Sequence, residues 1–442
     1  MTSQNGTAPA AGPIARWIES VKVYRDRRML VILLMGFSSG LPLLLTLSTL
    51  SYWLKKVGVD LTTIGLFALV GLPYSFKFVW APVVDQVRIP LLTRWLGRRR
   101  SWALLAQLFL IGAILFMGAT DPAVNGWATA LAALLIAFFS ATQDIAIDAY
   151  RIEILKDDEQ GAGAAATQIG YRIGLIVAGA GALFASDYVG WPLIFAGLAA
   201  FVLVGVVAVL IAREPKPPAS WDRVATAPFG EQLKISVVDP FVEFMTRRGV
   251  FVILAFVLLY KFGDAIGGTM AYPFYEEMGF TGTEIAAISK VLGVIATLLG
   301  VAAGGIIVSR YGIFRALIIG GILQAVTNVL YAWLAGRGHD LTALAITIGT
   351  DNFANGLGAA AFVAYLSSIC NVAFTGTQYA LLSSFMATGR TMLSSGSGWL
   401  AETLGWAPFF ITTMFLAVPG LLLIWWLMRL NLPEPKRPPG GP

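Results

Sequence analysis

The sequence predicts an all-α membrane protein of twelve transmembrane helices, arranged as two six-helix bundles. The 442 residues are 57% hydrophobic and only 13% charged, with a mean hydropathy of +0.75. This balance cannot cover a soluble surface. The apolar runs are long enough to cross a bilayer as helices, which takes about 20 residues, whereas the strands of a barrel are shorter and alternate. Lys and Arg also gather on one side of these runs, as in helical membrane proteins.

Twelve apolar runs stand between breaks rich in charged or turn-forming residues. We expect the spans at 29–54, 61–80, 101–119, 127–150, 161–185, 191–212, 249–271, 284–308, 314–335, 341–369, 378–401 and 406–429. The first run is too long for a signal-peptide core and no small-x-small cleavage site follows it, so we interpret it as an uncleaved span. The single cysteine, Cys370, excludes an internal disulfide. With His339 as the sole histidine, we expect neither a metal site nor a cofactor.

The spans divide into two halves around a polar segment. We expect a cytoplasmic tail at 1–28, a six-helix bundle at 29–212, a cytoplasmic linker at 213–248, a second six-helix bundle at 249–430 and a tail at 431–442. Prolines and charges fill the linker, which is too short to form a domain.

The distribution of positive charge predicts the orientation. Of the 31 Lys and Arg, 23 lie on the side of the termini and the linker, five lie within spans, and three lie in loops on the other side: Lys55, Lys56 and Arg337. The positive-inside rule therefore predicts that both termini are cytoplasmic. Orientation also explains the net charge of +6, and no basic domain that could hold a nucleic acid exists.

Two loops at matching positions of the halves carry related patterns. The second span is followed by "APVVDQV...GRRR" and the eighth ends in "GGIIVSRYGIFR". Both resemble the loop motif G-x-x-x-D-R-x-G-R of the major facilitator superfamily, although Ser309 stands where the second copy would have its acid. The repetition in two six-span halves supports that superfamily's fold. The candidate gating residues are Asp85, Arg98, Arg99, Arg310 and Arg315.

Ionisable residues within the spans are the main functional signal, because a charge at mid-membrane is expensive unless it faces a cavity or a partner. They are Lys77, Asp144, Asp148, Arg172, Lys261, Asp264, Lys290, Asp351 and Arg390. Spans 3, 6, 9 and 12 have none, and these are the outermost helices in the superfamily. Lys77 lies near the inner end of its span, where its side chain can reach the interface.

The carboxylates allow two interpretations. Asp144 and Asp148 share one helical face, and two carboxylates in a low dielectric raise each other's pKa, which suits reversible protonation. Alternatively, they pair with Arg172 or Arg151 and hold spans 4 and 5 together. Because the spans contain no histidine, proton coupling must use carboxylates. The candidates are Asp144, Asp148, Asp264 and Asp351.

Other residues of the same spans suit a large polar solute. Amides hydrogen-bond hydroxyl and peptide groups, aromatic faces stack on sugar rings, and cations pair with carboxylates. Together they predict a wide, wet cavity. The candidate binding residues are Arg172, Arg390, Lys261, Gln143, Gln168, Asn352, Asn355, Tyr150 and Tyr171.

Five segments spread over both halves carry a family resemblance. They are "GFSSGLP" (36–42), "YSFKFVWAPVVD" (74–85), "SATQDIAIDAYR" (140–151), "GAGAAATQIGYR" (161–172) and "TQYALLSSFMATGR" (377–390). They resemble the AmpG muropeptide permease family of the major facilitator superfamily. The resemblance implies proton-driven import of N-acetylglucosaminyl-anhydro-N-acetylmuramyl peptides across the bacterial inner membrane. It also implies a role in peptidoglycan recycling and β-lactamase induction, and we expect a monomer.

Three other functions remain open. The first is a facilitator of another organic anion or sugar acid. The second is a membrane enzyme, which the missing His/Cys sites, the lack of a phosphate-binding glycine loop and the twelve-span repeat disfavour. The third is a sensor that transports nothing, which the polar central spans disfavour. We therefore expect a transporter rather than an enzyme.

Overall fold

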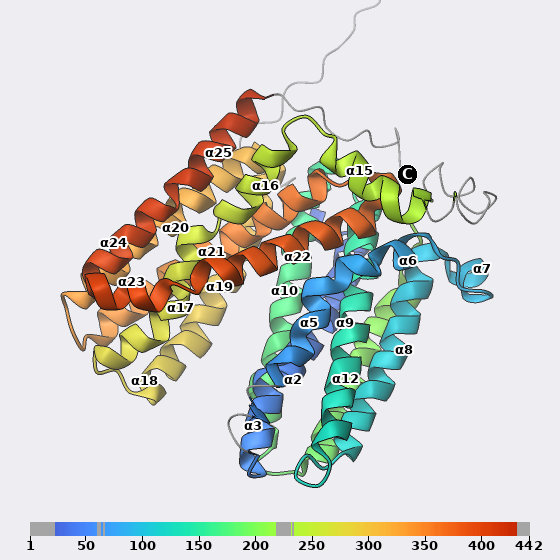
Figure 1. Cartoon of the computed structure of the whole chain (residues 1–442), viewed down its shortest axis with the longest axis horizontal. Helices are drawn as coiled ribbons and strands as arrows, with labels where there is room; N and C mark the ends of the chain where they lie inside the picture. The colour runs from blue at the N-terminus through green and yellow to red at the C-terminus, as the bar shows by residue number, and fades with distance from the viewer. Residues whose placement is uncertain (1–22, 60–62, 65–66, 218–230, 232–233, 431–442) are drawn as a thin grey trace, which may run out of the picture.

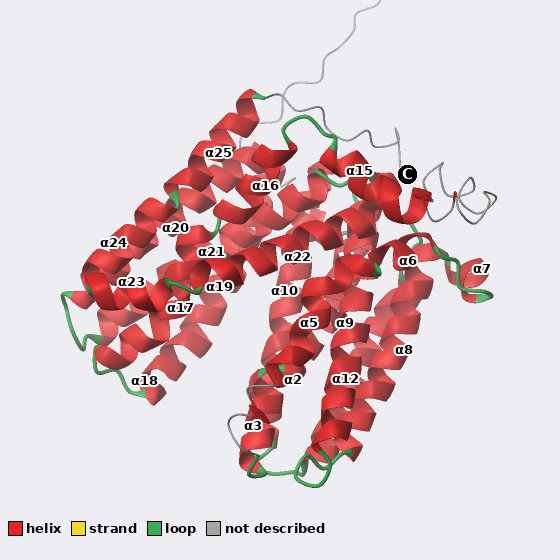
Figure 2. Ribbon diagram, viewed as in Figure 1, coloured by secondary structure: helices red, strands yellow, loops and turns green. Residues whose placement is uncertain are grey.

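The computed structural model describes residues 23–59, 63–64, 67–217, 231 and 234–430, and within them all regular structure is helical (Figures 1 and 2). The expected tail 431–442 lies outside the described residues. The expected tail 1–28 is described only from Val23 onward, and the linker 213–248 only in part.

The first half of the described chain covers the region in which six spans are expected. Its elements are α2 (Arg27–Thr46), α3 (Ser48–Lys56), η2 (Phe67–Gly71), α5 (Leu72–Phe76), η3 (Lys77–Val79), α6 (Ala81–Gln86), α7 (Leu92–Leu96), α8 (Arg98–Ala119), α9 (Gly126–Ile154), η4 (Asp157–Glu159), α10 (Gln160–Ile176), η5 (Val177–Gly181), α11 (Ala182–Ala185) and α12 (Trp191–Ile211). Side chains cap several of these helices; Asn125 Oδ1, for example, accepts a hydrogen bond from the N–H of Ala128 at the start of α9.

The second half follows the linker. Its elements are η6 (Lys234–Val238), α15 (Asp239–Met245), α16 (Val250–Leu259), α17 (Phe262–Glu277), α18 (Gly282–Ala287), η7 (Ile288–Gly293), α19 (Val294–Tyr311), α20 (Ile313–Ala335), α21 (Leu341–Ser368), η8 (Val372–Phe374), α22 (Thr375–Ser394), α23 (Ser397–Leu404), α24 (Trp406–Leu416) and α25 (Val418–Arg429).

The second expected span is broken into short pieces rather than continuous. Pro73 and Pro82 stand in the first turns of α5 and α6, where a missing N–H is tolerated, but each interrupts the helix that precedes it. Lys77 begins the single turn η3 between these pieces. The break therefore sets the direction of a charged side chain.

Nine helices in the described part of the chain are long and apolar enough to cross a membrane. A bent pair, 341–368 with 372–404, meets at 97° and adds a tenth. The apolar helix Leu69–Val79 in the second span is too short by the same measure. Helix length alone thus does not reach the expected twelve, because one span is broken and two others form a single bent unit.

Glycines let neighbouring helices approach at backbone distance. A Cβ on Gly170 of α10 would lie 2.0 Å from the carbonyl oxygen of Leu33 in α2, and one on Gly300 of α19 would lie 2.0 Å from that of Phe353 in α21. Small residues at such crossings are typical of helix packing in membranes.

The two halves meet at one end and diverge toward the other (Figure 1). We call the end that carries α6 and α15 the linker end, and the end that carries α3 and α18 the far end. Near the linker end, buried residues of both halves share one apolar cluster, in which Ile152 and Ala164 pack with Val308 and Phe362. The inter-half contacts that position the site therefore lie at the linker end.

Candidate functional site

Three cations from different helices lie close enough for their charges to interact. They are Arg172 in α10, Lys261 before α17 and Arg390 in α22. Lys261 pairs with Asp264 at 3.6 Å. Within the described residues neither arginine forms an ion pair, and Arg172 Nε is buried there without a hydrogen-bond partner. We call Arg172, Lys261 and Arg390 the cation cluster.

Two carboxylates of the second half accompany the cation cluster. Asn355 in α21 links Lys261 and Asp264, because its Oδ1 accepts from Lys261 Nζ at 3.2 Å and its Nδ2 donates to Asp264 Oδ2 at 2.8 Å. Asp351 accepts from Thr327 Oγ1 at 3.0 Å and from Tyr331 OH at 3.2 Å. Three positive charges thus stand against two negative ones.

A separate group of four charges lies within the first half. Asp144 accepts a hydrogen bond from Ser39 Oγ in α2 at 2.6 Å, and Asp148 lies 3.5 Å from Arg151. The ammonium group of Lys77 interacts electrostatically with both carboxylates. We call Lys77, Asp144, Asp148 and Arg151 the balanced cluster, because its formal charges cancel.

Lys77 was not among the candidate site residues, and the structure places it differently from the expected snorkelling position. Lys77 is only 8% exposed. Its side chain points into the protein, because the break in span 2 between Pro73 and Pro82 changes the direction of the backbone there. The two prolines were the signal in the sequence that could have indicated this.

The polar and aromatic candidates differ in their surroundings. Gln143 is fully buried and its amide bonds to Ser38, and Tyr150 lies in the core of the first half. The Asn352 side chain accepts from Thr297 Oγ1 at 3.0 Å. In this conformation these three residues join helices. Gln168 and Tyr171 are half-buried on α10, beside Arg172 in the sequence. The side chain of Lys290 lies outside the described part of the chain.

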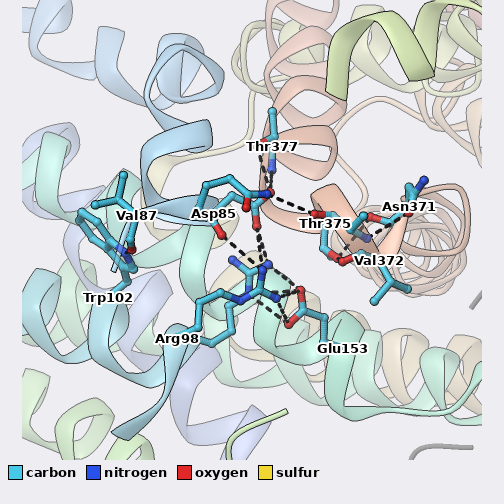
Figure 3. Close-up of polar contacts among 12 residues, drawn as sticks. Asp85, Val87, Arg98, Trp102, Glu153, Asn371, Val372, Thr375 and Thr377 are labelled. Carbon is cyan, nitrogen blue, oxygen red and sulfur yellow. Dashed lines mark hydrogen bonds and ion pairs between the residues drawn. The ribbon is translucent and has the colours of Figure 1, made fainter. Parts of the chain in front are cut away.

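A network of ion pairs and hydrogen bonds joins the halves at the linker end (Figure 3). We call it the first gate; its members are Asp85, Arg98, Arg99, Glu153 and Thr377. Asp85 is fully buried and lies 2.5 Å from Arg99 Nη2 and 4.0 Å from Arg98 Nη1. Glu153 near the end of α9 bridges the same arginines at 2.5 and 2.9 Å. From the second half, the N–H and the hydroxyl of Thr377 each donate to Asp85 Oδ2 at 3.0 Å.

The charges of the first gate fix the ionisation of its central carboxyl. Burial alone raises the pKa of Asp85, but the charges of Arg99 and Arg98 and the N–H of Thr377 outweigh it and hold that pKa below its usual range. Glu153 and Thr377 were not expected in the gate, because neither belongs to the loop motif.

The C-terminal part of α19 packs closely against α10; together with Gly312 and the start of α20 we call it the second gate. A Cβ on Gly161 would lie 2.4 Å from Val308 Cγ1 and 3.0 Å from the carbonyl oxygen of Gly305. The guanidinium of Arg310 lies 5.4 Å from the centre of the Tyr311 ring. The expected gating residues are thus divided between the two gates.

A cavity of about 1000 Å³ lies beside the second gate. Asp157 and Asp158 line it from the first half, and Ser309, Arg315 and Arg247 line it from the second half and the linker. Acidic and basic side chains of this cavity face one space, so its charge is mixed.

Residues 29–352 match the family described as the Major Facilitator Superfamily. The anhydromuropeptide permease of Escherichia coli strain K12 is 39% identical over 407 residues, which cover 91% of this chain and 80% of that protein. The putative transporter AmpG 4 of Rickettsia felis is 38% identical over 410 residues, which cover 92% of this chain and 98% of that protein.

A solved structure shares the arrangement of helices. The structure of the proton:xylose symporter XylE bound to 6-bromo-6-deoxy-D-glucose superposes with a TM-score of 0.66 over 95% of this chain and 97% of that one. At 14% identity, this likeness shows the fold alone.

Proposed function

The chain belongs to the major facilitator superfamily and, within it, to the AmpG-type permeases, and from this premise we propose that it is a proton-driven importer of anhydro-muropeptides. It is a multi-pass membrane transporter. Its proposed substrates are N-acetylglucosaminyl-anhydro-N-acetylmuramyl peptides, carried from periplasm to cytoplasm across the bacterial inner membrane. Import of these compounds would serve peptidoglycan recycling and β-lactamase induction.

The observation that carries this proposal is the excess positive charge of the cation cluster. The peptide carboxylates of a muropeptide suit Arg172 and Arg390, which have no ion-pair partner among the described residues. A planar guanidinium can hold a carboxylate through two parallel hydrogen bonds. Gln168, Asn355 and Tyr171 are the proposed partners of the sugar and peptide groups. The bound anion then satisfies charges that the chain leaves unbalanced.

The moving units of this transporter are the bundles 29–212 and 249–430. We assign the linker end to the cytoplasm, together with the tails 1–28 and 431–442 and the linker 213–248, since Lys and Arg gather there. With this assignment the helices diverge toward the periplasm, as in an outward-facing state (Figure 1). Rocking of the two bundles would expose the bound substrate to the other side.

Proton coupling is assigned to the carboxylates of the spans. Asp264 competes with the substrate for Lys261, so a proton on Asp264 frees the ammonium group for a peptide carboxylate. Asp351 neighbours this pair, and Asp144 and Asp148 form the second proton-binding group. At Asp264 the proton replaces the ion pair with Lys261 that the substrate breaks, which ties proton uptake to substrate binding.

Proteoliposome uptake of labelled anhydro-muropeptide tests the function. We expect an inward proton gradient to increase accumulation, and Arg172→Gln and Arg390→Gln to lower uptake about tenfold or more, as for loss of a charged hydrogen bond. Lys55→Gln, which removes an exposed cation outside the cluster, is the matched control.

A competition assay separates the alternative, a transporter of another organic anion or sugar acid. The same cations would hold any carboxylate. If a simple sugar acid competed as well as the anhydro-disaccharide, or if a collapsed proton gradient left accumulation unchanged, the proposal would be wrong in substrate or in driving force respectively.

A further inference from the structure

Arg151 is buried in a way that its surroundings do not satisfy. It is fully buried, and none of its three guanidinium nitrogens has a hydrogen-bond partner among the described residues. Two groups approach it: Asp148 Oδ1 at 3.5 Å and the ring of Tyr379, whose centre lies 5.4 Å from the guanidinium carbon. A guanidinium carries five N–H donors, so a buried one normally has several acceptors. Arg151 therefore depends on the charge of Asp148.

The other elements around Asp148 supply little replacement charge. On α9 itself, Asp144 lies one turn earlier, and Lys77 approaches from η3. Tyr171 in α10 and Tyr379 in α22 interact with Asp148 through uncharged phenol groups. The balanced cluster is therefore neutral only while both carboxylates are ionised, and among the described residues no acidic side chain of the second half is paired with it.

The position of Arg151 links this cluster to the closed linker end. Tyr379 lies two residues after Thr377, which holds Asp85 in the first gate, and Ala380, directly after Tyr379, packs in the core of the first half. When α22 lies against α9, as here, Tyr379 covers Arg151. Separation of α22 from α9 would uncover the guanidinium to water.

We propose that Arg151 couples protonation of Asp148 to opening of the transporter at the linker end. A proton that binds a carboxylate oxygen of Asp148 removes the negative charge that pairs with Arg151 among the described residues. The cluster then holds a buried net positive charge, and it regains water when α22 moves away from α9. In the opened state the same proton leaves Asp148 for the linker-side solvent and the ion pair forms again. The inference rests on the proposed proton-driven function and names the residue that transmits the proton's effect.

Distance measurements without substrate test the proposal. Spin labels are attached at Val87→Cys and Met428→Cys, two exposed linker-end positions of different halves, in a Cys370→Ala background. Pulsed EPR in nanodiscs from pH 8 to pH 5 then reports the separated population. We expect this population to grow as the pH falls.

Charge variants identify the residues. Asp148→Asn should favour the separated state at every pH, by a factor on the order of 100, the effect of breaking a buried ion pair. Adding Arg151→Met to Asp148→Asn should restore the closed state, because the buried cation is then gone. Arg151→Lys keeps the charge and should retain the pH response, and Glu402→Gln, an exposed carboxylate, should behave as the parent.

Two results would overturn the proposal: a parent protein whose distances do not change with pH, or a double variant as separated as Asp148→Asn alone. The parent titration needs no substitution, so it decides even where a variant does not fold. Because no substrate is present, a failure of muropeptide uptake would overturn the proposed function and leave the distance measurements standing. A failure of the distance measurements would overturn the role of Arg151 and leave the uptake result standing.

Discussion

The two gates occupy matching positions in the two halves, but different forces hold them. Asp85 and Ser309 stand at the same point of the repeated loop pattern. Asp85 meets the first turn of α22 through two hydrogen bonds and is paired with arginines. Ser309 Oγ is buried with no hydrogen-bond partner among the described residues, and a cavity of about 1000 Å³ lies beside it.

This difference shows how one substitution in a repeat changes the nature of a contact. A carboxylate at the first gate can accept from the free N–H groups at the start of α22, where the helix also favours negative charge. A serine at the second gate brings no charge to the start of α10, so glycine packing between Gly161 and Gly305 is what brings the helices together. Ion pairs and hydrogen bonds hold the first gate closed, whereas close packing of helices at glycines holds the second.

Removing the carboxylate of the first gate should have the largest effect. Asp85→Asn removes one of the carboxylates, Asp85 and Glu153, that pair with the buried Arg98 and Arg99, and loss of one partner of a buried ion pair costs about 3 kcal/mol or more. We expect the closed population, measured by the same spin-label pair, to fall more than tenfold. Asp187→Asn, an exposed carboxylate 3.9 Å from Lys56, should change it by less than about twofold. Equal effects of the two variants would contradict a polar first gate.

Filling the close approach of the second gate should have the next largest effect. A Cβ on Gly305 would lie 2.6 Å from Ala165 Cβ and 3.0 Å from the Gly161 carbonyl oxygen, so Gly305→Ala forces the helices apart. Overpacking costs about 1–3 kcal/mol, and the closed population should fall accordingly. Gly268→Ala is the control, because a Cβ there has nothing within 4 Å. If both alanines were neutral, packing would not hold this gate.

Restoring an acid to the second gate should reduce the difference between the gates. Ser309→Asp places a carboxylate in the cavity that the first residue of α10, Gln160, also lines. A negative charge near a helix N-terminus stabilises by about 0.3–1 kcal/mol, so the closed population should rise a few-fold. Ser368→Asp adds the same charge on another wall of the cavity and should not raise it. If Ser309→Asp left the closed population unchanged, a carboxylate at position 309 would not form the kind of polar contact that Asp85 forms in the first gate.

The fold class could be predicted from the sequence because each membrane-spanning helix requires a continuous run of apolar residues. Each apolar run reflects its own contact with lipid and neighbouring helices, and nine helices in the described part of the chain, or ten with the bent pair, are long and apolar enough to cross a membrane. Helix continuity was predicted less well. The prolines at 73 and 82 broke span 2 and turned Lys77 inward, although composition alone suggested one continuous helix.

The partners of charged residues could not be predicted, because they depend on tertiary contacts. The sequence left open whether Asp148 binds Arg151 or Arg172, and the structure pairs it with Arg151. Glu153 and Thr377 lie outside the loop motif, and they meet Asp85 only after distant helices pack. The excess charge of Arg172 likewise becomes visible only once its neighbours are known.

The smallest effect is expected from pH acting on the first gate. The folded-state pKa of Asp85 is lowered by Arg99 and Arg98, so its contribution to the closed state is fully present above the ordinary aspartate value of about 4 and is lost only as the pH falls through the lower folded value. This is measured in a background that carries Asp148→Asn and Arg151→Met, which removes the proposed pH response. In that background, the difference in closed population between proteins with and without Asp85→Asn should stay constant from pH 5 to pH 8. A difference that shrinks toward pH 5 would mean that Asp85 takes up a proton in the working range. The first gate, rather than Asp148, would then be where protonation opens the transporter.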